Sequence, residues 1–303
     1  MKIKLFVVLV LCVAAFGFNA CTEIGPPIDL TPETPPVVGA KKSGLISDTT
    51  YTETTIPAAD VKHILMEEFS GQKCTNCPSG KYAIKQIMAA NLGKISSVTL
   101  HTNVFAPLSD PIAPVDFRTS FATEISNNYG NGIGIPCAMV NRVLFSGQTA
   151  RAMTTPSTWA GFVTSELSKT SYVNIKLNSI WDETIMQDSV SVELHFANAA
   201  PVNDSINLTV MLIEDKIEAP QDSSGIEVEH YEHENILRTM LTNSSGVQIK
   251  GAKTAGNVKR YEFRTDVIDA KKWNINNLKL VAFVNKQNAG NYEVIQVAEI
   301  KLK

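Results

Sequence analysis

Between residues 61 and 167, short apolar runs of strand length alternate with segments whose apolar positions have helical spacing. Strands are predicted at 61–69, 95–105 and 137–145, with a return strand at 148–153. Helices are predicted at 77–92, 115–127 and 157–167. The order β-α-β-α-β-β-α indicates a central sheet that is covered by helices.

From about Ser171 the pattern changes to strict alternation of apolar and polar residues. Six half-buried strands are predicted, around residues 173–177, 190–196, 206–212, 261–267, 278–284 and 292–302. Such strands, separated by turn residues, favour an antiparallel, immunoglobulin-like sandwich. Residues 226–245 fit none of these strands and are predicted to be a charged connection.

The first twenty residues have the pattern of a signal peptide. Lys2 and Lys4 precede an apolar stretch, residues 5–18, which is too short to cross a bilayer as a helix. The small residue Ala20 and then Cys21 follow, an arrangement that resembles the lipobox of bacterial lipoproteins. The resemblance implies cleavage before Cys21 and attachment of lipid to its sulfur, which anchors the protein to a membrane. The alternative is an ordinary secretory signal with a chance cysteine.

Four segments follow from these patterns. We predict a signal peptide at 1–20, a Pro/Thr-rich tether at 21–58, an α/β domain at 59–170 and a β-sandwich domain at 171–303. The later half of the tether, around residues 39–55, is also compatible with a strand that joins a neighbouring domain.

The charge of the chain excludes one class of partner. The formal net charge is −3, and loss of Lys2 and Lys4 would lower the 27 basic residues to 25 against 30 acidic ones, a net charge of −5. No long basic run is present, so no nucleic acid partner is expected. No second apolar segment approaches the ~18 residues of a membrane-spanning helix.

Cys74 and Cys77 lie where a predicted strand ends and a predicted helix begins. A cysteine at this position is close to free N–H groups and to the positive end of the helix dipole, which favour the thiolate. We therefore predict that Cys74 is the exposed, attacking thiol and that Cys77 resolves the mixed disulfide. A structural disulfide remains the alternative, as does a metal site that includes His63 and His101. We expect no metal and no cofactor.

A second motif adds to the cysteine pair. Ile135-Pro136 precedes a predicted strand, roughly sixty residues after the pair, and together with the order of elements this resembles the thioredoxin superfamily. The resemblance implies a cis peptide bond before Pro136, which would face the cysteines and shape the substrate-binding edge. It also implies that Glu68 is a buried acid that helps to deprotonate Cys77. The alternative for Glu68 is a solvated charge at the strand end. Cys137 stands where the superfamily usually has threonine.

The mature chain also resembles a narrower family, the Bacteroidetes outer-membrane lipoproteins named after an outer-membrane protein of about twenty-eight kilodaltons. The segments that carry this resemblance are 67–71, the Cys74-x-x-Cys77-Pro78 motif, Ile135-Pro136 with 140–142, 231–238 and 278–284. The family implies a location in the outer membrane, either periplasmic or surface-exposed, and no settled activity.

The sequence is therefore compatible with two functions. The first is thiol–disulfide exchange on envelope proteins, with Cys74, Cys77, Pro136 and Glu68 as the site and the membrane as a partner through lipid on Cys21. The second is a non-catalytic surface lipoprotein that binds a protein or glycan and uses the Cys74–Cys77 disulfide as a staple. His230 and His233 also suggest a metal site, although a solvated loop explains their spacing more simply.

Overall fold

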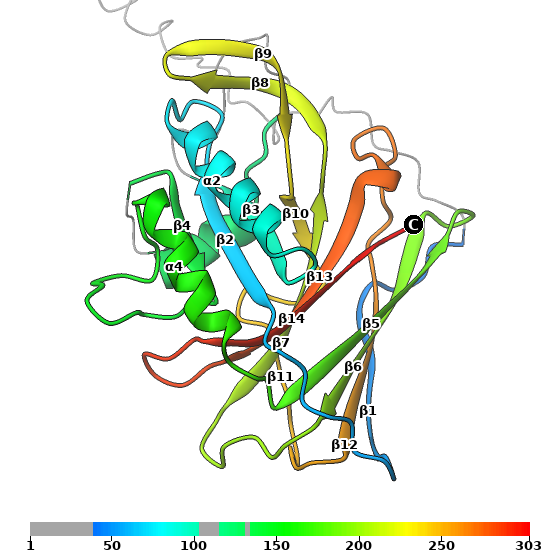
Figure 1. Ribbon diagram of the computed structural model, residues 1–303. Coiled ribbons are helices and arrows are strands. Elements are labelled where there is room, and N and C mark those ends of the chain that lie inside the picture. The colour runs from blue at the N-terminus through cyan, green and yellow to red at the C-terminus, as the bar shows by residue number, and fades with distance from the viewer. Residues whose placement is uncertain (1–38, 103–114, 131–133) are drawn as a thin grey trace, which may run out of the picture. The chain divides into compact units, whose positions relative to one another are not determined.

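Strands are more abundant than helices in the structure, a computed structural model that describes residues 39–102, 115–130 and 134–303 (Figure 1). The strands form a four-stranded sheet, an eight-stranded sheet and a two-stranded hairpin. All of them belong to one contact unit, Val37–Lys303. These sheets confirm one part of the predicted fold, a mostly β architecture with several sheets. Cys21 lies outside the described residues.

The four-stranded sheet is antiparallel and has the order β1-β12-β6-β5. Its strands are β1 (Gly44–Thr52), β12 (Asn257–Arg264), β6 (Gln187–Phe196) and β5 (Val173–Asp182). β1 lies inside the segment predicted as a tether, so the later half of that segment does add a strand to a sheet. Every residue of β1 after Gly44 is exposed, which explains why its sequence lacks an apolar face.

The eight-stranded sheet has the order β14-β13-β7-β10-β3-β2-β4, with β11 paired to β7. Its strands are β14 (Val294–Lys301), β13 (Leu278–Lys286), β7 (Ile206–Glu214), β10 (Ile236–Met240), β3 (Ile95–His101), β2 (Ile64–Ser70), β4 (Cys137–Val140) and β11 (Val247–Gln248). β3 runs parallel to both β2 and β10, and the other neighbours are antiparallel. Strands from the predicted α/β region and from the predicted sandwich region therefore share one sheet.

Hydrophobic cores lie on both faces of the eight-stranded sheet. Val210 and Leu212 of β7 pack in a core that the four-stranded sheet closes from the other side. Met211 and Ile213 of the same strand pack in a second core on the opposite face. Burial of a side chain of this size contributes about 1.5–3 kcal/mol, so packing on both faces stabilises β7 in the sheet.

Three α-helices cover the end of this sheet that contains β2, β3 and β4. Side chains of α2 (Cys77–Ala90) and α4 (Pro156–Leu167) share a core with Ile64 and Met66 of β2. On the other face, α3 (Ser120–Ile125) and the π-helical turn η1 (Ser126–Gly130) share a core with Leu65 and Phe69. The predicted return strand at 148–153 is reduced to an isolated bridge between Ala138 and Met153.

A β-hairpin occupies part of the segment that was predicted as a charged connection, so that prediction is wrong. β8 (Ile217–Ser223) and β9 (Ile226–His233) pair antiparallel around a turn at Ser224 and Gly225. Both turn residues have positive φ angles, 56° and 80°, which glycine adopts without steric cost. In Figure 1 the hairpin is the yellow pair of strands beside the start of α2.

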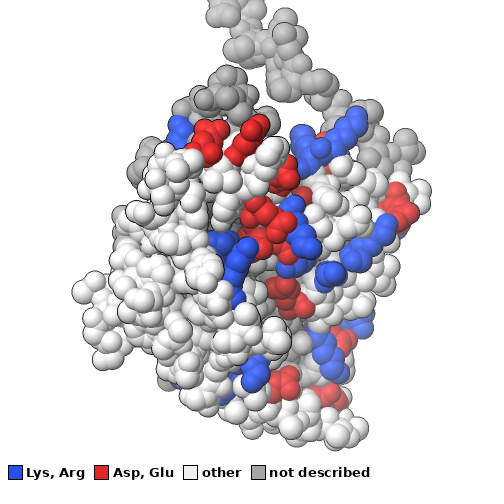
Figure 2. Space-filling model, turned by 45° about the horizontal axis from the view of Figure 1, so that its top comes forward, with Lys and Arg blue, Asp and Glu red and all other residues white. Residues whose placement is uncertain are grey.

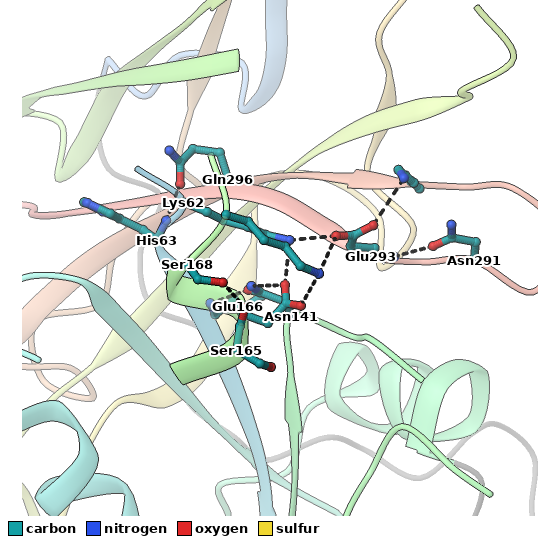
Figure 3. A network of polar contacts seen from close by, with 12 residues as sticks. Lys62, His63, Asn141, Ser165, Glu166, Ser168, Asn291, Glu293 and Gln296 are labelled. Carbon is teal, nitrogen blue, oxygen red and sulfur yellow. Dashed lines mark hydrogen bonds and ion pairs between the residues drawn. The ribbon is translucent and has the colours of Figure 1, made fainter. Parts of the chain in front are cut away.

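A buried ionic network ties the α/β elements to the sandwich (Figure 3). Lys62, at the entrance to β2, donates to Glu166 of α4 at 2.7 Å and to Glu293, next to β14, at 2.8 Å. Asn141, just after β4, donates to the same Glu166 oxygen at 3.2 Å. Lys62 and Glu166 are almost inaccessible to solvent. Loss of one partner from such a pair costs about 3–5 kcal/mol, because the remaining charge stays buried.

Candidate functional site

Cys74 and Cys77 form a disulfide at the amino terminus of α2, with an S–S distance of 2.04 Å and Cα atoms 5.3 Å apart. Cys77 is the first helical residue, and Pro78 follows it in the first turn. The backbone turns tightly here, since the Cys77 N–H donates to the carbonyl oxygen of Cys74 at 3.1 Å. The disulfide thus lies at the positive end of the helix dipole, as predicted.

Cys74 and Cys77 are both buried in the oxidised, disulfide-bonded protein. Cys74 is 6% exposed and Cys77 is 2% exposed. The prediction that Cys74 is exposed is therefore wrong for the oxidised protein. Residues 220–224 of the hairpin β8–β9 hydrogen-bond to the loop that carries the disulfide.

Pro136 and Glu68 both lie close to Gly80, three residues after Cys77 in α2. The Ile135–Pro136 peptide bond is cis, as predicted. A Cβ atom added to Gly80 would lie 2.9 Å from Cβ of Pro136 and 3.3 Å from a carboxylate oxygen of Glu68. Glycine at position 80 therefore allows the proline ring and the carboxylate to approach the helix.

Glu68 is fully buried, as is its neighbour Glu67, so the alternative of a solvated pair of charges is excluded. The carboxylate of Glu68 pairs with Lys81 of α2 at 3.2 Å and accepts from the Thr99 hydroxyl at 3.3 Å. Its other oxygen, Oε1, has no hydrogen-bond donor among the described residues. Glu67 points elsewhere and forms a buried bidentate pair with Arg142.

Lys81 is a residue of this site that the sequence analysis did not identify. Its ammonium group donates to the Thr99 hydroxyl at 2.6 Å and to the carbonyl oxygen of Glu234 at 3.1 Å, besides pairing with Glu68. Its position four residues after Cys77, on the same helix face, was the available signal. Lys81 links the buried acid to the end of the hairpin.

Cys137 is a free, buried thiol in the strand that follows Pro136. Burial, with a contribution from the charge of Glu68, raises the pKa of this thiol to about 12. A thiol with so high a pKa is not a nucleophile at neutral pH. Cys137 faces the core that contains Phe69 and Met139 and acts there as a small apolar residue.

The candidate metal-binding histidines do not gather into one site. His230 is exposed and pairs with Glu218, whereas His233 is buried against the rings of His101, Phe117 and Tyr231. His63 lies at the entrance to β2, where its N–H donates to Gln296. Within residues 39–102, 115–130 and 134–303, no group of three or more His, Cys, Asp or Glu residues could hold a metal ion.

Comparison with known families supplies the identity of the chain. A family described as "Outer membrane protein Omp28" matches residues 123–303. The chain belongs to the Omp28 family of outer membrane proteins. The resemblance inferred from the sequence is confirmed, and this Omp28-family protein is a component of the cell envelope, at the outer membrane. No helix in the described part of the chain is both long and apolar enough to span a membrane.

Comparison with solved structures gives matches to this Omp28-family protein at low sequence identity. HBP35 of Porphyromonas gingivalis matches with a TM-score of 0.62 and 18% identity, over 81% of this chain and 77% of that one. A protein of Agrobacterium tumefaciens matches with a TM-score of 0.48 and 12% identity, over 81% and 97% of the two chains. A domain of the outer membrane lipoprotein Omp28 from P. gingivalis gives a TM-score of 0.31 and 19% identity, over 44% and 89%. No curated protein matches the sequence.

Proposed function

We propose that this protein is a lipid-anchored thiol–disulfide exchange protein of the cell envelope, which acts through Cys74 and Cys77. The observation that carries the proposal is the gathering of the disulfide, cis Pro136 and buried Glu68 around the first turn of α2. A buried carboxylate with an unpartnered oxygen beside a cysteine pair marks a candidate reactive site. Lipid on Cys21 would hold the reaction at a membrane.

Within this proposal, residues 59–170 are thioredoxin-like and residues 171–303 are an immunoglobulin-like sandwich. The sheet order β3-β2-β4 supports the first assignment, with β3 parallel and β4 antiparallel to β2 and α2 as the connection between β2 and β3. The core between the two sheets supports the second.

The proposed step transfers two electrons from a dithiol of a partner protein. A thiolate of the partner attacks Sγ of Cys74, the bond between Cys74 and Cys77 breaks, and Cys77 leaves as a thiolate. The partner's second thiolate then attacks the partner's first sulfur, which is joined to Cys74 in the mixed disulfide, and Cys74 leaves as a thiolate. The partner gains a disulfide, and its two protons are taken up by Cys74 and Cys77. Glu68 would act as a positioning residue that exchanges a proton with Cys77.

Trapping of mixed disulfides in the envelope tests the proposal. Cys77→Ser should accumulate disulfide-linked adducts with envelope proteins, because Cys74 attacks a partner disulfide in the reverse of this step and the Cys77 thiol that would release the adduct is absent. Cys74→Ser is the matched control and should accumulate none. If neither variant traps a partner, in cells that make both at the level of the native protein, the exchange reaction is refuted.

A second function, a non-catalytic binding protein with a permanent disulfide staple, is favoured by two other observations. Cys74 and Cys77 are almost inaccessible in the oxidised protein. A surface cleft of about 550 Å³ near the start of the hairpin is lined by Trp273, Lys216 and Lys271, among others. An aromatic ring beside lysines suits a protein or glycan ligand. Failure of both trapping variants would favour this second function.

A further inference from the structure

The backbone of β8 runs along the loop that carries the disulfide. The Asp222 N–H donates to the carbonyl oxygen of Gln72 at 2.7 Å, and the Ser224 N–H donates to the carbonyl oxygen of Thr75 at 2.9 Å. Asp222 belongs to β8, and Ser224 is the turn residue that follows it, with a φ angle of 56°. The end of β8 and its turn thus bind the disulfide loop through main-chain N–H groups.

Gln221 adds a side-chain contact at the same place. Its Nε2 atom donates to the carbonyl oxygens of Gly71 and Cys74, at 3.2 Å each. In the opposite direction, Nε2 of Gln72 donates to the carbonyl oxygen of Pro220 at 3.2 Å. Gln72 and Gln221 are buried. Buried polar groups lose free energy when a partner is removed, so these contacts hold the hairpin against the loop.

This arrangement conflicts with access to the disulfide. Thiol–disulfide exchange needs an attacking thiolate in contact with a sulfur, and its rate depends on access. With the hairpin bound to their loop, Cys74 and Cys77 are 6% and 2% exposed. A cysteine on a folded partner cannot reach a sulfur that is so deeply buried.

We infer that the hairpin β8–β9 occupies the binding position of a polypeptide substrate beside the Cys74–Cys77 loop, and that Gln221 holds it there. The inference rests on the proposed function. The substrate is a segment of a partner protein, which replaces the end of the hairpin by donating its main-chain N–H groups to the carbonyl oxygens of Gln72 and Thr75. Recognition through main-chain atoms depends little on the sequence of the partner.

The rate of disulfide reduction in the folded, full-length protein tests the inference. Gln221→Met removes the side-chain donors at nearly constant length, and Asp222→Pro removes the N–H that bonds to Gln72. Each variant should be reduced by dithiothreitol about tenfold faster than the native protein, the change that one hydrogen bond of ordinary net strength makes in an opening equilibrium. Glu229→Gln, on the exposed part of β9, is the matched control and should leave the rate unchanged. Equal rates in the native protein and both variants would overturn the inference.

Hydrogen exchange supplies a test that needs no variant. The amides of Asp222 and Ser224 should be protected in the oxidised protein, and exchange at the rate of exposed amides would contradict the inference. Failure of the proposed function gives a different result. If the variants are reduced faster but Cys77→Ser traps no partner in any background, the hairpin position stands and the exchange reaction fails. If Cys77→Ser traps partners equally with and without Gln221→Met, the exchange reaction stands and the role of the hairpin fails.

Discussion

At the residue scale, Gly80 is the position where the parts of the candidate site meet. Pro136 and Glu68 both approach it closely, and both residues are buried. The absence of a side chain at position 80 is therefore a requirement of the site, although glycine within a helix costs about 0.5–1 kcal/mol relative to alanine.

Gly80→Ala should destabilise the protein by about 1–3 kcal/mol, because the new Cβ would overlap with Pro136. Gly161→Ala in α4 is the matched control, since nothing lies within 4 Å of its Cβ position. That variant should instead stabilise the protein by a few tenths of a kcal/mol or more. Urea denaturation of both variants measures the two effects, and a loss of the same size at both positions would show that Pro136 does not restrict Gly80.

His233 predicts a dependence of stability on pH. Burial, which outweighs a weak hydrogen bond to Pro220, lowers the pKa of this imidazole to about 4. An unfolded histidine titrates near 6.5, so between about pH 6.5 and 4 the unfolded chain binds more protons than the folded one. The free energy of unfolding should therefore decrease as the pH is lowered from about 6.5 to 4, by about 3 kcal/mol in total from His233 alone.

Urea denaturation at pH 7 and pH 4.5 checks this expectation. His233→Phe should reduce the loss of stability between the two values, because the ring remains packed against Phe117 and Tyr231 but no longer titrates. His230→Gln is the control on the same strand, where Glu218 raises the pKa of an exposed imidazole instead. An unchanged pH dependence in His233→Phe would refute the assignment.

At the element scale, β1 protects an edge of the four-stranded sheet. It pairs with β12 from Gly44 to Thr52 but buries almost no side chain, so its contribution is mainly main-chain hydrogen bonding. A chain that begins at residue 54 should lose only modest stability but should self-associate, because β12 becomes an unpaired edge. A chain that begins at residue 40 should remain monomeric. Light scattering over a range of concentrations measures the difference, and monomeric behaviour of both would contradict this role of β1.

Periodicity predicted the elements whose two faces differ in polarity. The alternation in 190–196 and the helical spacing in 77–92 correspond to β6 and α2, since each buries one face. The hairpin was missed because β8 places only Ala219 and Ile217 in a small core, and most residues of β9 are exposed. The Ser224-Gly225 turn between two runs of strand length was the available signal.

At the scale of the whole molecule, the sequence did not reveal how the two halves of the chain connect. β10 lies between β7 and β3, and its parallel pairing with β3 joins residues more than a hundred positions apart. Local patterns contain no information on such a partner, because any buried strand of five apolar-rich residues would fit. The distribution of charge does not indicate how the two halves connect either, since acidic and basic side chains are interspersed on the face shown in Figure 2.

The predicted membrane anchor is lipid on Cys21, a residue that lies outside the described part of the chain. Cys21→Ala should abolish incorporation of labelled fatty acid and should leave the protein either uncleaved or released from the membrane fraction. Ser43→Ala, in the described segment before β1, is a control that should leave labelling intact. Continued labelling of Cys21→Ala would refute lipidation at this residue.

The central claim is that Cys74 and Cys77 form a redox-active couple. The reduction potential of this couple in the full chain, obtained by equilibration with glutathione buffers and quantified by alkylation, tests it most directly. Exchange proteins have potentials between about −120 and −270 mV, and the account predicts a value in this range. A value below about −300 mV would contradict it, because such a disulfide resists reduction and would be a permanent staple.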